Sequence, residues 1–272
     1  MRRPSPIRVL LPLLLLSVTA ALAQQTASSA SASTSTHTSS LDRLFINFIE
    51  DATIVDQQRW EGWFQYEDGD AVDISAAYGS AAFQLWTNTE VGGRVGFGKT
   101  DVDGTDLDGT GATDLDLWGK YYWNLGDRGT EISAGAILTV PTGDDAAGLG
   151  FDAFGIKGFV AGRFALESLI LTGTLGVQAN ESGRIFESDD IDGDSSFSIG
   201  GGVIVPWTDS FSLVGELSWK TGRFEDFEDD ARVLGGLNLR LSDRGMLRPA
   251  VSIGLEDGAP DYTFQIGYAH SF

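Results

Sequence analysis

The sequence of 272 residues contains no cysteine and only two histidines. Disulfides, thiolate metal sites and cysteine nucleophiles are therefore excluded, and histidine has little scope as a base or a ligand. Positive charge is also scarce, because 18 Lys and Arg face 39 Asp and Glu and leave a net charge of −21. Nucleic acid is not an expected partner, since phosphate binding needs clustered Lys and Arg.

A long hydrophobic run is missing too, and the one short run lies in an export signal. Arg2, Arg3 and Arg8 accompany a leucine-rich stretch over 9–16, and Ala21-Leu22-Ala23 forms a cleavage motif. We therefore expect residues 1–23 to be a signal peptide. Residues 24–40 are almost entirely Ser, Thr, Ala and Gln, which predicts a flexible leader.

The segment over 41–56 has a different pattern. Its apolar residues recur three and four positions apart, which is typical of one helical face. They are Leu41, Leu44, Phe45, Phe48, Ile49 and Ala52. The spacing predicts a short amphipathic helix over 41–56, with an irregular first strand as the alternative.

From residue 57 to 272 the apolar residues alternate with polar or small ones, which is typical of half-buried strands. We expect twelve strands of about ten residues, the length of a tilted membrane-spanning strand. They lie near 58–66, 72–86, 89–99, 113–124, 130–140, 151–164, 168–180, 195–207, 210–222, 231–241, 246–256 and 261–272. A soluble sandwich or a lipocalin-like barrel also alternates and is the competing interpretation.

The connections between these strands favour the membrane. Short turns alternate with mostly longer, acidic loops such as 101–112 and 181–194. Transmembrane barrels have tight turns on one side and long loops on the other, whereas a soluble sandwich has no reason to keep this parity. The prediction is an all-β, antiparallel, up-and-down transmembrane β-barrel of about 12 strands, located in the cell outer membrane.

The end of the chain resembles the terminal assembly signal of Gram-negative outer-membrane barrels. Gln265, Gly267 and Phe272 match its polar, glycine and terminal aromatic positions, while His270 departs from the apolar residue usual there. The resemblance implies that the barrel assembly machinery and outer-membrane lipids are partners of the chain.

A second resemblance is carried by motifs spread over residues 91–272. They are Gly111-Ala112-Thr113-Asp114, Lys120-Tyr121-Tyr122, Val140-Pro141-Thr142-Gly143-Asp144, Leu213-Val214-Gly215-Glu216-Leu217 and Asp257-Gly258-Ala259-Pro260-Asp261-Tyr262. In this order they resemble the outer-membrane transporter family labelled "MetA-pathway of phenol degradation". The resemblance implies a barrel that moves small hydrophobic or aromatic solutes.

The face opposite the apolar one decides what such a barrel passes. Alternation places charged residues of both signs on the inside as lumen-lining candidates. They are Glu90, Arg94, Asp116, Lys120, Lys157, Arg163, Glu216, Lys220, Arg232, Arg240, Arg248 and Glu256. Eight strands leave room only for side chains and sixteen leave an aqueous channel, so twelve allow a narrow pore or a closed polar core. The expected function is a passive transporter or channel; a structural or surface-interaction barrel with a sealed lumen is the alternative.

Catalysis is not expected. The sequence has no G-x-S-x-G motif, and His270 falls at the end of the last strand. The calcium-like pattern that starts at Asp106 has Leu117 where a bidentate Glu is needed. We therefore expect no catalytic residue, no metal site and no cofactor.

Overall fold

The computed structural model describes residues 42–46, 49–104, 108–125, 129–186 and 191–272. The expected signal peptide (1–23) and leader (24–40) lie outside the described residues. No helix in the described ranges is long and apolar enough to cross a membrane.

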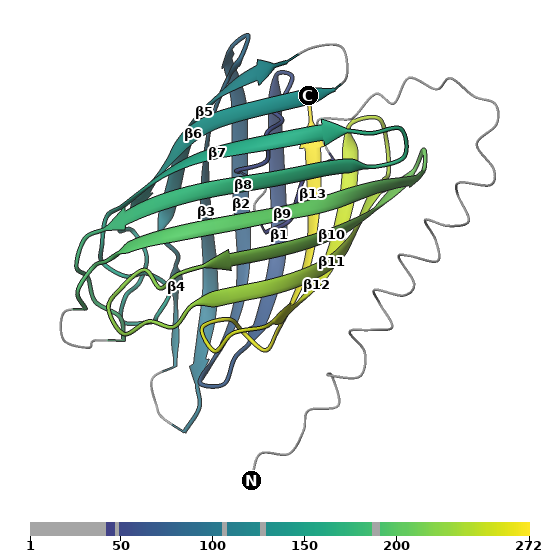
Figure 1. Cartoon of the computed structure of the whole chain (residues 1–272). Coiled ribbons are helices and arrows are strands. Elements are labelled where there is room, and N and C mark those ends of the chain that lie inside the picture. The colour runs from purple at the N-terminus through teal and green to yellow at the C-terminus, as the bar shows by residue number, and fades with distance from the viewer. Residues whose placement is uncertain (1–41, 47–48, 105–107, 126–128, 187–190) are drawn as a thin grey trace. The chain divides into compact units, whose positions relative to one another are not determined.

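The described chain forms antiparallel strands joined in one sheet (Figure 1). They are β1 (Gln58–Asp68), β2 (Val72–Trp86), β3 (Thr89–Val102), β4 (Gly109–Ala112), β5 (Leu115–Asn124), β6 (Thr130–Val140), β7 (Gly155–Ala165), β8 (Ile170–Asn180), β9 (Ser195–Thr208), β10 (Phe211–Lys220), β11 (Asp230–Arg240), β12 (Gly245–Gly254) and β13 (Tyr262–Ser271).

The sheet closes on itself as a barrel of twelve wall strands. β1 pairs with both β2 and β13, and β2 also pairs with β3, so the sheet has no free edge. β4 and β5 are two parts of one wall strand, because both pair with β3. The predicted fold class and strand number are confirmed, and the predicted strand positions lie close to the observed ones.

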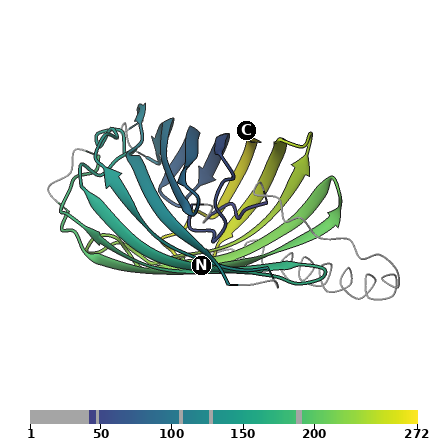
Figure 2. The same ribbon diagram turned by 90° about the horizontal axis from the view of Figure 1, so that it is seen from above.

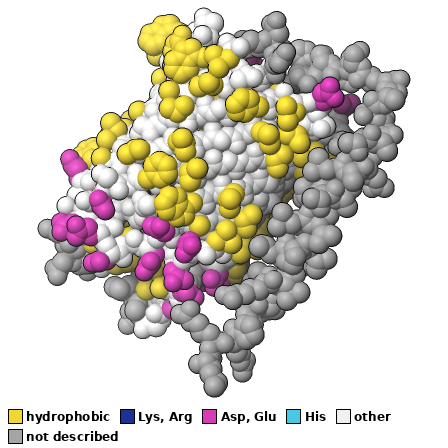
Figure 3. All heavy atoms as spheres, in the orientation of Figure 1, with side chains coloured by type: hydrophobic (Ala, Val, Ile, Leu, Met, Phe, Trp, Pro, Cys, Tyr) yellow, Lys and Arg dark blue, Asp and Glu magenta, His cyan; other side chains and the backbone are white. Residues whose placement is uncertain are grey.

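Strand β8 illustrates why the sequence forms this wall. Leu171, Leu175 and Val177 are 44%, 50% and 60% exposed on the outer face, whereas Thr172 and Thr174 are buried inside. Leu175 pairs with Val160 and Ile199 of the neighbouring strands, which continues the apolar row sideways. Hydrophobic side chains cover much of the outer surface in Figure 3. An apolar outer band with a polar interior is the arrangement of a barrel in lipid.

The two ends of the barrel differ. One end, called the short-turn end, carries the connections 87–88, 125–129, 166–169, 209–210 and 241–244. The other, called the long-loop end, carries the loops 141–154, 181–194, 221–229 and 255–261, together with 69–71 and the connection between β3 and β5. Acidic side chains gather toward the long-loop end, at the lower left of Figure 3. The alternation of short and long connections is as predicted.

The helix predicted over 41–56 is wrong for the residues that the structure describes. Residues 42–46 and 49–55 form turns and irregular backbone. These residues, called the plug, lie inside the curve of the strands, as the purple segment before β1 in Figure 2 shows. Leu44, Asp51, Ala52 and Val55 are at most 1% exposed. The helical spacing of the apolar residues therefore reflects contacts to the barrel wall on more than one side.

Candidate functional site: the occupied barrel lumen

The plug lacks a helix because charged side chains of the wall bind its backbone. The Glu216 carboxylate on β10 accepts hydrogen bonds from the amides of Phe45 and Ile46, the second at 3.0 Å. The Arg248 Nη2 on β12 donates to the carbonyls of Arg43 and Leu44 at 2.8 and 2.7 Å. A buried backbone group needs a partner, and these bonds replace those a helix would make.

Lys120 on β5 performs the same role at the second half of the plug. Its Nζ donates to the carbonyl oxygens of Ile49, Asp51 and Thr53 at 3.1, 2.9 and 2.8 Å. One ammonium group has three donors. Lys120 thus uses all of them on carbonyls that an irregular turn brings to one point.

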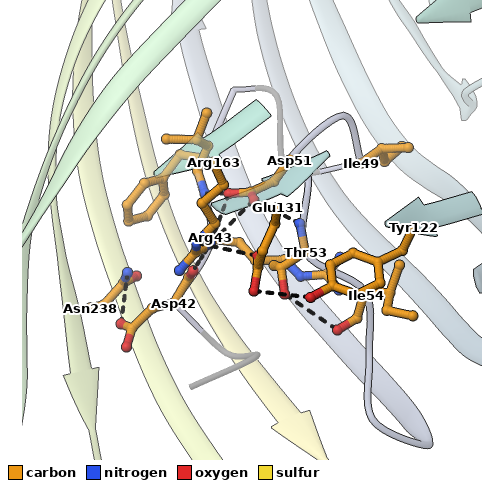
Figure 4. Close-up of polar contacts among 12 residues, drawn as sticks. Asp42, Arg43, Ile49, Asp51, Thr53, Ile54, Tyr122, Glu131, Arg163 and Asn238 are labelled. Carbon is orange, nitrogen blue, oxygen red and sulfur yellow. Dashed lines mark hydrogen bonds and ion pairs between the residues drawn. The ribbon is translucent and has the colours of Figure 1, made fainter. Parts of the chain in front are cut away.

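Ion pairs join the plug to the wall on several strands. Arg43 pairs with Glu90 of β3 at 2.9 Å, and Asp51 pairs with Arg163 of β7 at 3.2 Å. Figure 4 shows Arg163 and Asp51 facing each other, with Glu131 and Tyr122 beside them. Lys157–Glu50, at 2.5 Å, and Arg240–Asp42, at 3.7 Å, complete the plug-to-wall pairs among the described residues. A buried pair is strongly destabilised when one partner is removed, so these contacts fix the plug in place.

Burial alone would raise the pKa of the Asp51 carboxyl. The positive charges of Arg163, Arg43 and Lys120 outweigh that effect and hold its pKa below the usual value. Asp51 is therefore ionised at neutral pH, and its charge contributes stability that is lost as the pH falls through the lowered pKa.

Apolar contacts hold the plug as well. Leu44 and Phe45 belong to one buried cluster with Ile204, Val214 and Leu234 of the wall. Ile49 and Val55 belong to another, which includes Trp118, Ile137 and Phe159.

Two wall glycines make room for the first apolar cluster. A Cβ at Gly202 would lie 2.7 Å from the Leu44 side chain, and one at Gly236 would lie 2.7 Å from the Phe45 ring. Larger residues at either position would force the plug away from the wall.

The plug leaves part of the lumen empty. A cavity of about 500 Å³ remains, lined by Phe45, Ile46 and Glu50 of the plug and by Phe151 and Arg223 of the long loops. Its lining includes six bases, Arg94, Lys157, Lys220, Arg223, Arg232 and Arg248, and five acids, Glu50, Glu61, Asp114, Asp116 and Asp230. The lining is thus nearly balanced in charge, whereas the whole chain carries −21.

The structure places the lumen-lining candidates in two groups. The first group contacts the plug and consists of Glu90, Lys120, Lys157, Arg163, Glu216, Arg240 and Arg248. The second group forms ion pairs within the wall. Arg94 pairs with Asp116, and Lys220 pairs with Asp230 at 3.0 Å. Arg232 pairs with Asp230 at 2.8 Å and with Glu67 at 2.9 Å. Glu256 instead lies exposed in the loop after β12, because that strand ends at Gly254 and the alternation stops there.

Sequence reasoning missed the charged residues of the plug itself: Asp42, Arg43, Glu50 and Asp51. One signal for them was available, because the predicted lumen residues contain eight bases against four acids. A closed lumen with this excess of positive charge needs acidic side chains from another segment as ion-pair partners.

The predicted assembly signal lies on β13 and just beyond it. The Gly267 position has no room for a side chain, because a Cβ there would lie 2.8 Å from the Trp63 Cβ. The His270 ring stacks against Tyr268, with centroids 6.2 Å apart, and meets Phe272 edge-on at 4.7 Å. Gln265 pairs with Gln65 across the β1–β13 seam that closes the barrel. A role of these residues in assembly stays a prediction.

Comparison with known proteins supports the fold. No protein-family model and no curated protein matches the sequence. Among solved structures, the chain is similar to the COG4313 outer membrane channel from Pseudomonas putida F1, with a TM-score of 0.70 and 17% identity over 82% of this chain and 98% of that one. It is also similar to the NanC porin, with a TM-score of 0.55 and 10% identity over 78% of this chain and 100% of that one. A third similar structure is the KdgM porin in complex with disordered oligogalacturonate, with a TM-score of 0.54 and 11% identity over 78% of this chain and 99% of that one. The chain therefore has the fold of outer-membrane channels and porins.

Proposed function

We propose that this chain is an outer-membrane channel through which small apolar or aromatic solutes diffuse passively, past a plug that narrows the lumen. The cavity of about 500 Å³ between the plug and the long loops carries this proposal. A barrel that served only as a scaffold would have no need of open volume in its interior. The fold of outer-membrane channels and porins supports the same function.

The solute class rests on two features. The motif order over residues 91–272 resembles an outer-membrane transporter family for such molecules. In addition, the cavity lining includes the aromatic residues Trp63 and Tyr78, whose rings stack at 5.0 Å, together with Phe45 and Phe151. Aromatic faces next to polar groups suit a small aromatic solute.

A sealed structural barrel is the second candidate, and the plug is the observation that favours it. The charged residues where the plug meets the wall are at most 2% exposed, so water does not reach this part of the lumen. They are Arg43, Asp51, Glu90, Lys120 and Arg163. In that function the plug would close the barrel permanently.

Liposome swelling separates the two functions. We expect vesicles that contain the refolded protein to swell faster in phenylalanine than in glutamine, because the cavity offers aromatic surface to a solute that cannot cross lipid unaided. Protein-free vesicles are the control for leakage. Swelling no faster than the control in either solute would contradict the channel and support the sealed barrel.

A further inference from the structure

Arg223 differs from the other bases that line the cavity. It lies in the loop 221–229, between β10 and β11, at the long-loop end. Each of the other five lining bases has a carboxylate within 4.0 Å. Arg223 forms no such ion pair with any residue that the structure describes, and its buried Nη2 has no hydrogen-bond partner there. A guanidinium nitrogen that is buried without a partner is costly, which points to an anion that completes it.

The two carboxylates that act on Arg223 from a distance are both engaged elsewhere. Asp114 accepts hydrogen bonds from the amides of Gly143 and Phe151 at 2.9 and 3.3 Å. Asp116 binds Arg94. Burial lowers the pKa of the Arg223 guanidinium below its usual value, and the charges of Asp116 and Asp114 only partly oppose this. Neither acid is therefore available as a direct partner.

The loops hold Arg223 in place for a ligand. Its carbonyl oxygen accepts from the Asp194 amide and from the Asn180 Nδ2, both at 3.1 Å, and its Nε donates to the Asn180 Oδ1 at 3.3 Å. The guanidinium lies 5.1 Å from the ring centre of Phe151 and 5.7 Å from that of Phe224, whose side chain is 2% exposed. Contact with these rings orients the planar guanidinium without using its donors.

We propose that this cavity binds a small aromatic carboxylate, with its carboxylate on Arg223 and its ring against the aromatic residues of the lining. Guanidinium and carboxylate match in a two-bond geometry that neither a hydroxyl nor an amide reproduces. The volume of about 500 Å³ falls within the roughly 300–1,000 Å³ of small-molecule sites. This inference rests on the proposed solute class and narrows it from aromatic solutes to those that carry a carboxylate.

Calorimetric titration of the refolded full chain in detergent tests the site, with benzoate as the probe and benzyl alcohol as its neutral counterpart. Arg223→Gln should weaken benzoate binding at least tenfold, because the neutral amide removes the charge. Arg223→Lys should give an intermediate loss, since it keeps the charge but not the two-bond geometry. Benzyl alcohol should bind the native chain and both variants equally weakly.

The matched control is Arg184→Gln. Arg184 is also a loop arginine, but it is half exposed, pairs with Asp152 at 2.6 Å and does not line the cavity. Benzoate affinity should be unchanged in this variant, and heat-modifiable gel mobility reports that every variant is folded. Equal benzoate affinity in the native chain and Arg223→Gln would overturn the inference, and so would benzyl alcohol binding as tightly as benzoate.

Failure of this site and failure of the proposed function remain distinguishable. Benzoate binding in detergent needs no open passage, so it persists in a sealed barrel. Swelling in phenylalanine without Arg223-dependent benzoate binding would keep the channel and overturn only the carboxylate site.

Discussion

Leu175→Arg should prevent assembly of the barrel in the membrane. Leu175 is the central residue of β8, half exposed on the outer face and flanked by the outward Val160 and Ile199. A charge at the bilayer midplane of a barrel costs about 2–4 kcal/mol. We expect the variant to fractionate as unfolded chain, without the heat-modifiable gel mobility of the native barrel.

The same substitution at Leu241 is the matched control. Leu241 is 64% exposed but lies in a connection at the short-turn end, where the cost falls to about 0–1 kcal/mol. Leu241→Arg should therefore assemble. Normal assembly of Leu175→Arg would show that this face does not contact lipid.

Asp51→Ala should release the plug while the wall stays closed. The variant removes the closer of the two carboxylates that pair with the buried Arg163, at 3.2 Å against 3.9 Å for Glu131, and breaking a buried pair costs about 3–5 kcal/mol. It also removes the acceptor of the Leu44 and Thr53 amides, both at 3.2 Å. Hydrogen–deuterium exchange over residues 42–55 should accelerate by about a hundredfold or more, since each 1.4 kcal/mol is a factor of about ten. Exchange in β8 should not change.

An exposed ion pair supplies the control for charge alone. Lys99 and Asp101 lie 3.7 Å apart with both side chains more than half exposed, and such pairs contribute about 0–1 kcal/mol. Asp101→Ala should leave exchange in the plug unchanged. The double variant Asp51→Leu/Arg163→Met should restore much of the protection, because it removes both charges of the Asp51–Arg163 pair together. Native protection in Asp51→Ala would mean that the wall charges do not hold the plug.

The wall could be predicted from the sequence because its structure depends on local alternation. In β8 each outward Leu or Val faces lipid and each inward Thr faces the lumen, so a period of two determines both faces. The connections also carry local signals, since tight turns and long acidic loops differ in length and composition. Glu256 lies where this reasoning fails, because alternation does not show where a strand ends.

The plug could not be predicted in the same way. Leu44, Phe45 and Ile49 have helical spacing, yet their partners Val214, Leu234 and Phe159 lie more than a hundred residues away. Lys120 and Glu216 bind the plug backbone, and no pattern within the segment reveals those partners. Tertiary contacts therefore override the local helical preference, and the excess of inward bases was the one sequence signal that pointed to a missing acidic segment.

Planar-bilayer conductance tests most directly whether the lumen is a passage that the plug narrows. The refolded native chain is compared with a variant that lacks residues 42–55, and both must show the gel mobility of a closed barrel. We predict small but measurable conductance steps for the native chain and steps several-fold larger for the variant, because the deletion removes the segment that fills the lumen. The absence of conductance steps from both proteins, or equal conductance of the two, would contradict this function.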